Sequence, residues 1–434
     1  MSIPGDPRAF LEALLRAALA AADPMMRVPS ALPAPSPGCT IVLGAGKAAA
    51  RMAQAVEAHY AGDLRGLVVV PYGHALACRR IEVVEAAHPV PDRAGVRAAA
   101  RALALAEEAG EEDLVLVLLS GGGSALWTLP PPGVRLRDLA ALNAALLRSG
   151  ATIGEMNCVR RHLCRIKGGR LARAAWPAAT FTLAISDVPG DDPAVIASGP
   201  TVADPTSCAD ARAVLARYGI TRPRRVLDYL EACPDETPKP GDPRLARSHY
   251  RLVARPIEAL EAAAAHARRA GVPALILGDA IEGEAREVGR VLAAIARSCQ
   301  RHGHPLAPPA LLLSGGETTV TVRGAGSGGR NVELLLALAL ALEGSAEIWA
   351  LAADTDGIDG REPVAGAIVT PDTLARAAAL GVDARAALAA NDAHGFFRRL
   401  GDGIVTGPTC TNVNDFRAIL VRAPEGGAAS DQKR

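Results

Sequence analysis

Three short apolar runs, each ending in a glycine-rich turn, constrain this chain more than any other feature. They lie at residues 41–43 before Gly44-Ala45-Gly46-Lys47, at 114–119 before Ser120-Gly121-Gly122-Gly123-Ser124, and at 311–313 before Ser314-Gly315-Gly316. A continuously apolar run of this length is typical of a strand buried on both faces, as in a parallel sheet. Because glycine has no Cβ, the main chain after such a strand can approach a ligand closely and point its N–H groups at phosphate oxygens. The pattern therefore predicts an α/β protein with phosphate-binding turns.

Strand-like and helix-like segments alternate along the first half of the chain, which favours a parallel sheet covered by helices. Strands are expected at residues 40–43, 67–70, 82–85, 114–119 and 180–185, and beyond the proline-rich stretch at 249–254, 274–277, 311–322 (a pair around Glu317), 347–352, 366–369 and 417–421. A length of 434 residues favours two domains. We expect an N-terminal domain at 1–238, a linker at 239–248, an α/β C-terminal domain at 249–422 and a tail at 423–434.

Composition excludes several classes of protein. A net charge of +1 and 3% aromatic residues argue against a nucleic-acid partner. Segments long and apolar enough for a membrane span are not found in the sequence, and the N-terminus lacks the pattern of a secretory signal. The eight cysteines form no CxxC pair, so we expect them to be reduced, buried residues of a cytoplasmic protein.

Lysine is rare, and its positions are informative. Only 4 of the 47 basic residues are lysine, namely Lys47, Lys167, Lys239 and Lys433. Lys47 and Lys167 lie beside glycines in motifs that look ordered. A lysine at a helix start is disfavoured by the helix dipole, and a bound anion would remove that conflict at Lys47. Chance survival of these lysines is the alternative interpretation.

Gly44-Ala45-Gly46-Lys47-Ala48-Ala49 matches the relaxed dinucleotide fingerprint G-x-G-x-x-A, which favours a nicotinamide enzyme as a rival hypothesis. The acidic residue expected at the end of the second strand is missing, because Val70-Pro71-Tyr72 stands there. The motif is not a Walker A loop either, since the longer glycine loop and the hydroxyl after the lysine are absent. The motif alone therefore leaves the ligand open.

Acidic loops offer candidate cation sites. Residues 186–193 place Asp187, Asp191 and Asp192 just after a predicted strand, where a turn or a Mg²⁺ site explains them. A second acidic loop at 353–360 does not have the spacing of an EF-hand. The turn at 406–415 carries hydroxyls and amides that suit ligand contact or capping equally.

Arg330 follows a glycine-rich stretch at 324–329 and begins a leucine-rich helix. The helix dipole disfavours a cation in a first turn unless it serves an anion. The planar guanidinium can hold a carboxylate or a phosphate at two points. Arg330 is therefore a candidate anion-binding residue, with a structural ion pair as the alternative.

Taken together, these motifs identify a family resemblance. The chain resembles the glycerate 2-kinases of the MOFRL type from about residue 10 to 421, through Gly44–Lys47, Ser120–Leu126, Ile166–Ala172, Ser186–Pro193 with Ala197–Thr201, Gly328–Asn331 and Thr406–Thr409 in this order. The combination is highly specific, although each motif alone is not. Some family members are labelled hydroxypyruvate reductase, which keeps the nicotinamide alternative open.

The resemblance implies a Rossmann-like N-terminal domain, a smaller α/β C-terminal domain, and transfer of the γ-phosphoryl group of ATP to the 2-hydroxyl of D-glycerate with Mg²⁺. It implies that Lys47 and Arg330 are essential. We assign Lys47, Arg330 and Asp187 to catalysis, and Lys47, Arg330 and Asn331 to substrate binding. Asp187 and Asp191 are the candidate metal ligands. The candidate nucleotide-binding residues are Gly44, Gly46, Ser120, Gly121, Gly122, Gly123, Ser124, Lys167, Ser314, Gly315 and Gly316.

Small departures from the family pattern occur at Cys410, at Asp354 and at residues 361–364, and they put a role of the 354–364 loop in question. The alternatives to a kinase are an NAD(P)H-dependent hydroxypyruvate reductase and a non-catalytic protein that binds phosphometabolites. The expected protein acts on small molecules as a monomer or homodimer.

Overall fold

The computed structural model describes residues 5–423, which divide into two compact units. One unit contains residues 23–255 together with 410–412, and the other contains the remaining described residues, 5–22, 256–409 and 413–423. We call them the parallel-sheet unit and the mixed-sheet unit. The expected tail at 423–434 lies almost wholly outside the described residues.

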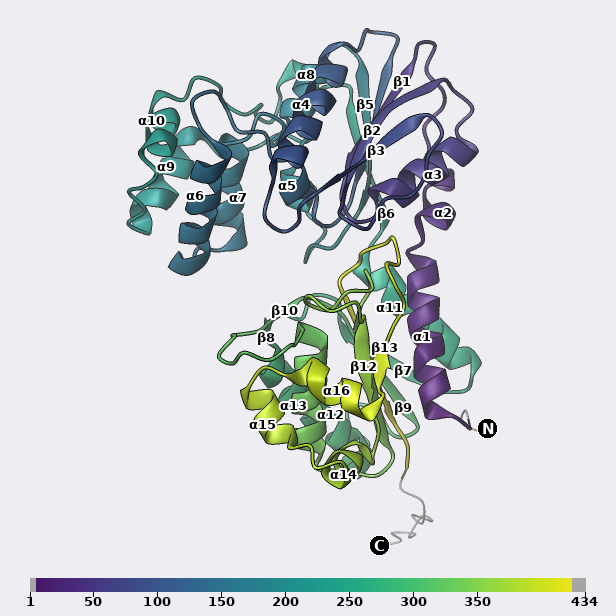
Figure 1. The fold of residues 1–434 in the computed structure, drawn as a ribbon. Helices are drawn as coiled ribbons and strands as arrows, with labels where there is room; N and C mark the ends of the chain where they lie inside the picture. Colours follow the sequence, from purple (N-terminus) through teal and green to yellow (C-terminus); the bar gives the residue numbers. More distant parts are fainter. Residues whose placement is uncertain (1–4, 424–434) are drawn as a thin grey trace, which may run out of the picture. The chain divides into compact units, whose positions relative to one another are not determined.

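The parallel-sheet unit is built on six parallel strands in the order β3-β2-β1-β4-β5-β6 (Figure 1). Their bounds are β1 Thr40–Ala45, β2 Leu64–Pro71, β3 Ile81–Ala86, β4 Leu114–Leu119, β5 Ala179–Ile185 and β6 Ser248–Ala254. Strands β1 and β4 are buried at every position, as their continuously apolar sequences predicted. The order is that of a doubly wound sheet, in which ligands bind beyond the carboxyl ends of the strands where the order reverses. That point lies between β1 and β4.

Helices surround this sheet, and four of them form a separate bundle. The helices of the unit are α2 Pro24–Arg27, α3 Ala49–His59, α4 Arg93–Glu107, α5 Gly123–Leu126, α6 Leu136–Ser149, α7 Ile153–His162, α8 Arg170–Ala175, α9 Cys208–Arg217 and α10 Arg224–Ala232. Helices α6, α7, α9 and α10 group beside the sheet (Figure 1). They share an apolar core of their own, which includes Leu142, Val159 and Leu230.

The mixed-sheet unit has six strands in the order β13-β12-β11-β14-β9-β7, of which only β7 and β9 pair in parallel. The strands are β7 Ala274–Gly278, β9 Ala310–Ser314, β11 Ile348–Asp354, β12 Gly366–Val369, β13 Gly403–Ile404 and β14 Asp415–Val421. The helices are α1 Pro7–Ala21, α11 Pro256–Arg269, α12 Ala285–His302, α13 Arg330–Leu342, α14 Thr373–Ala379, α15 Ala384–Ala389 and α16 Ala393–Leu400. Helix α13 is buried on most sides, which explains its almost uniformly apolar sequence.

The division between the units differs from the expected domain bounds at both ends. Strand β6 pairs with β5 as the sixth strand of the parallel sheet, so the chain leaves that unit near residue 255 and not at 239–248. Helix α1 belongs with the mixed-sheet unit, where it packs on α11. Strand pairing and helix packing join segments that are far apart in the sequence, and neither can be predicted from local composition.

Two further expectations need correction. The predicted strand pair around Glu317 does not form, because β10 (Thr318–Thr319) pairs in parallel with β8 (Gly283–Glu284) instead of with β9. The cysteines are not all reduced, because Cys208 and Cys233 form a disulfide that links the start of α9 to the end of α10. The two cysteines are 25 residues apart and become neighbours only through the bundle. Among the described helices, none combines the length and the apolar character needed to cross a bilayer.

Candidate active site

The turns after β1 and β4 are joined by hydrogen bonds at the point where the strand order reverses. The Lys47 amide donates to the Gly121 carbonyl at 2.9 Å, and the Ala48 amide donates to Ser120 Oγ at 3.0 Å. Gly46 has a φ of 139°, and a Cβ there would overlap Ser120. Glycine is required because both the conformation and the close approach exclude a side chain. Two of the three turns that the sequence predicted to bind phosphate are therefore joined to each other.

Asp187 reaches the same edge of the sheet from the end of β5. A Cβ on Gly121 would overlap the Asp187 carboxylate and the Asn412 amide. The Asn412 side-chain amide donates to Asp187 Oδ2 at 3.0 Å, which orients the carboxylate. Asn412 belongs to the turn that the sequence left open between ligand contact and capping, and only its long-range contact with Asp187 distinguishes it there.

Lys167 lies behind the second glycine turn and is only 4% exposed. Its ammonium donates to the Ser124 carbonyl at 2.7 Å, and Ser124 Oγ shares a 2.8 Å hydrogen bond with Ser198 Oγ. Burial lowers the pKa of Lys167 below its ordinary value. The structure thus brings Lys47, residues 120–124, Lys167 and Asp187 to the same end of one sheet.

Gly44 has a structural position. It lies inside β1, paired with Val68 and Leu118, and a Cβ there would press on the Leu118 carbonyl. Its lack of a side chain serves the packing of the sheet, whereas Gly46 serves the turn.

The acidic loop after β5 concentrates negative charge. Asp187 and Asp191 are partly buried, and Asp192 is exposed and caps the following turn by accepting from the Ala194 amide at 2.8 Å. Burial raises the pKa of the Tyr250 hydroxyl, and Asp192, Asp187 and Asp191 raise it further. Such a loop suits Mg²⁺, which binds through one or two carboxylates and substrate phosphates. Asp187, beside the glycine turn, fits a magnesium ligand, and Asp191 lies in the same loop.

In the mixed-sheet unit, Arg330 begins α13 and is surrounded by carboxylates. Its Nε donates to Asp415 Oδ1 and its Nη2 to Asp354 Oδ2, both at 2.8 Å, and its Nη1 donates to Glu317. Burial acts to lower the pKa of Arg330, but Asp415, Asp354 and Glu317 together raise it above its ordinary value. The structural ion pair, which was the alternative interpretation of Arg330, is therefore present, and three carboxylates take part in it.

Asn331 and Asp359 complete the helix start. The Asp359 carboxylate accepts from the amides of Asn331 and Val332 at 3.1 and 3.0 Å, so it supplies the negative charge that a helix N-terminus favours. The Asn331 side chain donates to Asp415 Oδ1 at 2.8 Å. Burial raises the pKa of Asp359 to about 6, against the opposing effect of the Val332 amide and with a smaller contribution from Asp415. Asp359 belongs to the acidic loop at 353–360, and the spacing of acidic residues in that loop did not indicate that Asp359 caps α13.

The turn Ser314-Gly315-Gly316 lies at the end of β9 in the mixed-sheet unit, not on the sheet that carries Lys47. Its carbonyls accept from its own unit: Gly315 from Arg417 at 2.9 Å and Gly316 from the Asp415 amide at 3.2 Å. A Cβ on Gly316 would overlap the main chain of Ile281. Packing within the mixed-sheet unit therefore accounts for much of the close contact that this turn makes with neighbouring residues.

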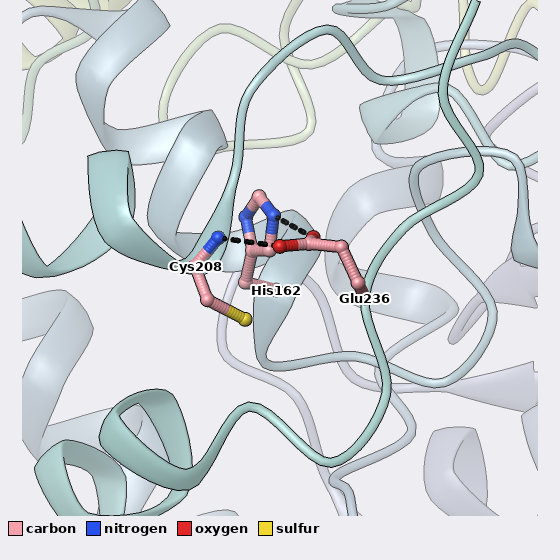
Figure 2. A group of neighbouring side chains, drawn as sticks. All are labelled: His162, Cys208 and Glu236. Carbon is pink, nitrogen blue, oxygen red and sulfur yellow. Dashed lines mark hydrogen bonds and ion pairs between the residues drawn. The ribbon is translucent and has the colours of Figure 1, made fainter.

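A cluster of His162, Cys208 and Glu236, shown in Figure 2, has the spacing of a metal site. Glu236 accepts from His162 Nε2 and from the Thr237 amide, both at 2.8 Å, and from the Cys208 amide at 2.9 Å. The Cys208 sulfur is bonded to Cys233. The Cys208 sulfur therefore offers no thiolate, and the Glu236 carboxylate is surrounded by hydrogen-bond donors. The cluster is a structural contact that links α7 to the start of α9.

A doubly wound parallel sheet with two glycine turns, a lysine and an acidic loop at the carboxyl ends of its strands is typical of α/β proteins that bind phosphate-bearing ligands.

Comparisons with known proteins identify the family. A model described as a domain of unknown function, DUF4147, matches residues 10–231, and the MOFRL family model matches residues 310–415. A D-glycerate 2-kinase of Thermotoga maritima is 40% identical over 94% of this chain and 97% of its own length. A crystal structure of a glycerate kinase from Thermotoga maritima superposes with a TM-score of 0.85 at 38% identity, over 95% of this chain and 99% of that one. The chain belongs to the MOFRL-type glycerate kinase family, which confirms the resemblance.

A relative from Agrobacterium vitis, 55% identical over 95% of this chain and 94% of its own length, carries the name hydroxypyruvate reductase. Family membership therefore supports glycerate kinase activity, although this relative is named after a different reaction, the reduction of hydroxypyruvate.

Proposed function

We propose that the protein transfers the γ-phosphoryl group of ATP to the 2-hydroxyl of D-glycerate, giving 2-phospho-D-glycerate and ADP. The observation that carries the proposal is the joined surface at the carboxyl ends of β1, β4 and β5, where Lys47, the 120–124 turn and Asp187 meet. Phosphoryl transfer depends mainly on alignment and on neutralising the charge of the transferred group. A lysine, main-chain amides and a carboxylate that suits a magnesium ligand are the groups this reaction uses.

Each residue has a distinct role in this proposal. Lys47 and the turns after β1 and β4 hold phosphate oxygens of the nucleotide. Asp187, oriented by Asn412, holds Mg²⁺, with Asp191 contributing. When bound, the ion neutralises charge on the phosphates and fixes their geometry.

Arg330 takes a more specific role than the sequence indicated. Asp354 and Asp415 are 5% and 0% exposed and hold Nη2 and Nε, while Glu317 is 48% exposed and holds Nη1. The Glu317 pair is the weakest of the three, because exposed ion pairs contribute little. In our proposal the substrate carboxylate or the transferred phosphoryl group replaces Glu317 at Nη1, and Asn331 supports the arrangement through Asp415.

A hydroxypyruvate reductase is the second candidate, favoured by the name of the Agrobacterium relative and by the strand order. Two observations weigh against it. Strand β2 ends at Pro71 without the acidic residue that binds a ribose hydroxyl. Gly44 lies inside β1, where a dinucleotide fingerprint needs its first glycine in the turn.

One assay separates the candidates. The purified protein is given D-glycerate and MgATP with an ADP readout, in parallel with hydroxypyruvate and NADH or NADPH. We expect ADP formation that requires glycerate and is abolished by EDTA and restored by Mg²⁺. NMR of the product decides whether the 2- or the 3-oxygen carries the phosphate. Oxidation of nicotinamide without ADP formation would overturn the proposal.

A further inference from the structure

A pocket of about 220 Å³ lies within the parallel-sheet unit, next to the second glycine turn. Gly122, Ser124 and Lys167 form the wall on the side of the sheet. The opposite wall comes from the four-helix bundle, through Leu139 of α6 and Arg160 of α7. The pocket is therefore lined both by the bundle and by the turn at the carboxyl end of β4.

Two cations line this pocket, Arg160 and Lys167, and no carboxylate is among its lining residues. Arg160 Nε donates to the Asn143 side chain at 3.1 Å, and the Lys167 ammonium donates to the Ser124 carbonyl at 2.7 Å. Neither cation has an ion pair with a carboxylate anywhere in residues 5–423. All the partners of these two charges are thus neutral.

This arrangement is costly for the folded protein alone. Lys167 is buried and Arg160 is partly buried. This loss of water lowers the pKa of both groups, because no counter-ion replaces it. Buried charges in proteins are ordinarily paired. Elsewhere in the same unit the rule is kept, since Arg170 is paired with Asp235 and Arg161 with Asp204. Arg160 and Lys167 both lack a counter-ion and line the same cavity, which points to an anion supplied by a ligand.

We infer that the pocket binds an oxyanion group, a carboxylate or a phosphate, of one of the two substrates, with Arg160 and Lys167 as its cationic contacts. The inference rests on the proposed function for the identity of the substrates. A guanidinium can hold such a group at two points, and the ammonium supplies a compact charge beside it. The apolar walls, among them Leu139, Leu142 and Leu163, exclude water and strengthen these contacts.

The size of the pocket limits what enters. Pockets for drug-sized ligands are usually about 300–1,000 Å³, and this one is about 220 Å³. It accommodates glycerate, or one end of a nucleotide, but not a whole nucleotide. The carboxylate of glycerate and a phosphate of ATP are therefore the two sources of the anion, and binding measurements distinguish them.

Titration calorimetry on the full chain provides the test, with D-glycerate, 2-phosphoglycerate, ADP and inorganic phosphate as separate probes. Arg160→Gln and Lys167→Met remove one charge each, and Arg160→Lys keeps the charge. Arg148→Gln, on an exposed arginine of the neighbouring helix α6, is the matched control. We expect Arg160→Gln and Lys167→Met to weaken one class of probe about 10-fold or more, with partial recovery in Arg160→Lys and no change in Arg148→Gln.

The pattern of losses names the source of the anion. Weaker glycerate and 2-phosphoglycerate binding with unchanged ADP assigns the pocket to the acceptor, and weaker ADP binding alone assigns it to the nucleotide. The inference is overturned if all four probes bind Arg160→Gln and Lys167→Met as they bind the wild type, or if none binds the wild type. The glycerate-dependent ADP assay on the wild type tests the proposed function separately. Kinase activity of the wild type together with unchanged probe binding by the variants would contradict only the assignment of this pocket.

Discussion

Two cation sites, one in each unit, differ in how their charges are compensated. In the parallel-sheet unit, Lys167 and Arg160 face a pocket with neutral partners only. In the mixed-sheet unit, Arg330 is held by Asp354, Asp415 and Glu317. In our proposals, the cations with neutral partners bind an anion that arrives with a ligand. Arg330, which already has three carboxylate partners, exchanges only its exposed contact with Glu317.

This difference has a direct consequence for mutagenesis. Removing a cation of the first kind leaves no buried charge without a counter-ion, so it affects ligand binding more than folding. Removing one of the second kind leaves buried carboxylates without a counter-ion, which costs folding free energy as well. Substitutions in the two units are expected to separate activity from stability.

The largest effect is expected for Arg330→Ala. Three carboxylates lose their shared partner, and breaking a buried pair costs about 3–5 kcal/mol, which corresponds to a melting temperature lower by roughly 6–12 °C. Activity falls as well, by about 100-fold or more, as when a transition-state donor is removed. Differential scanning calorimetry and the ADP assay measure both. An inactive variant that melts like the wild type would show that the carboxylates do not depend on Arg330.

Lys47→Ala is expected to lower kcat by about 100- to 1,000-fold, because an ammonium that holds phosphate oxygens is lost. Its melting temperature should fall less than that of Arg330→Ala, because Lys47 is partly exposed in a turn whereas Arg330 holds three carboxylates. Lys47→Arg serves as the comparison that keeps the charge. A melting temperature as low as that of Arg330→Ala would break the contrast between the two units.

Gly121→Ala tests the joined turns without removing any charge. The new Cβ would overlap the Asp187 carboxylate and the Asn412 amide, so both must move. A shift of about 1 Å near the chemistry can cost about 100-fold in rate, and we expect a loss of about 10- to 100-fold in kcat. Gly154→Ala, at an exposed helical glycine where a Cβ would make only an ordinary contact with Thr152 Oγ1 at 4.0 Å, is the matched control and should keep full activity.

The smallest effect concerns pH and Asp359. Its pKa is raised to about 6, so the folded chain binds this proton more tightly than the unfolded chain does. Stability from this group is therefore greatest below about pH 4 and declines as the pH rises to about 6. Asp359→Asn removes the titration, so its melting temperature should gain a few degrees relative to the wild type between pH 4.5 and pH 7. A constant difference across that range would contradict the assignment.

Local patterns were sufficient for several parts of the fold. The strand predicted at 114–119 has those bounds as β4, and the runs at 40–43 and 180–185 are the cores of β1 and β5. Such predictions succeed because a strand buried on both faces must be continuously apolar. The strand at 249–254 was also found, but as β6 of the parallel sheet, since pairing partners are set by the whole sheet.

The candidate site was predictable to the same degree. The turns with Lys47 and residues 120–124 followed from glycines after apolar runs, and parallel strands brought their carboxyl ends together with Asp187. Asn412 and Arg160 carried no such signal, because an amide in a turn and an arginine on a helix are ordinary until their neighbours are known.

The sequence by itself determined the α/β class, the positions of the glycine turns and the family, because hydrophobic periodicity and the steric freedom of glycine act over a few residues. Only the tertiary structure decided which unit owns α1 and β6, which cysteines pair, and which cations have partners. Arg330 meets Asp415 across 85 residues of sequence because distant segments pack together. For the same reason, Lys167 and Arg160 have no carboxylate partner within the part of the chain that the structure describes. Charge compensation depends on distance in space, and a linear pattern does not encode it.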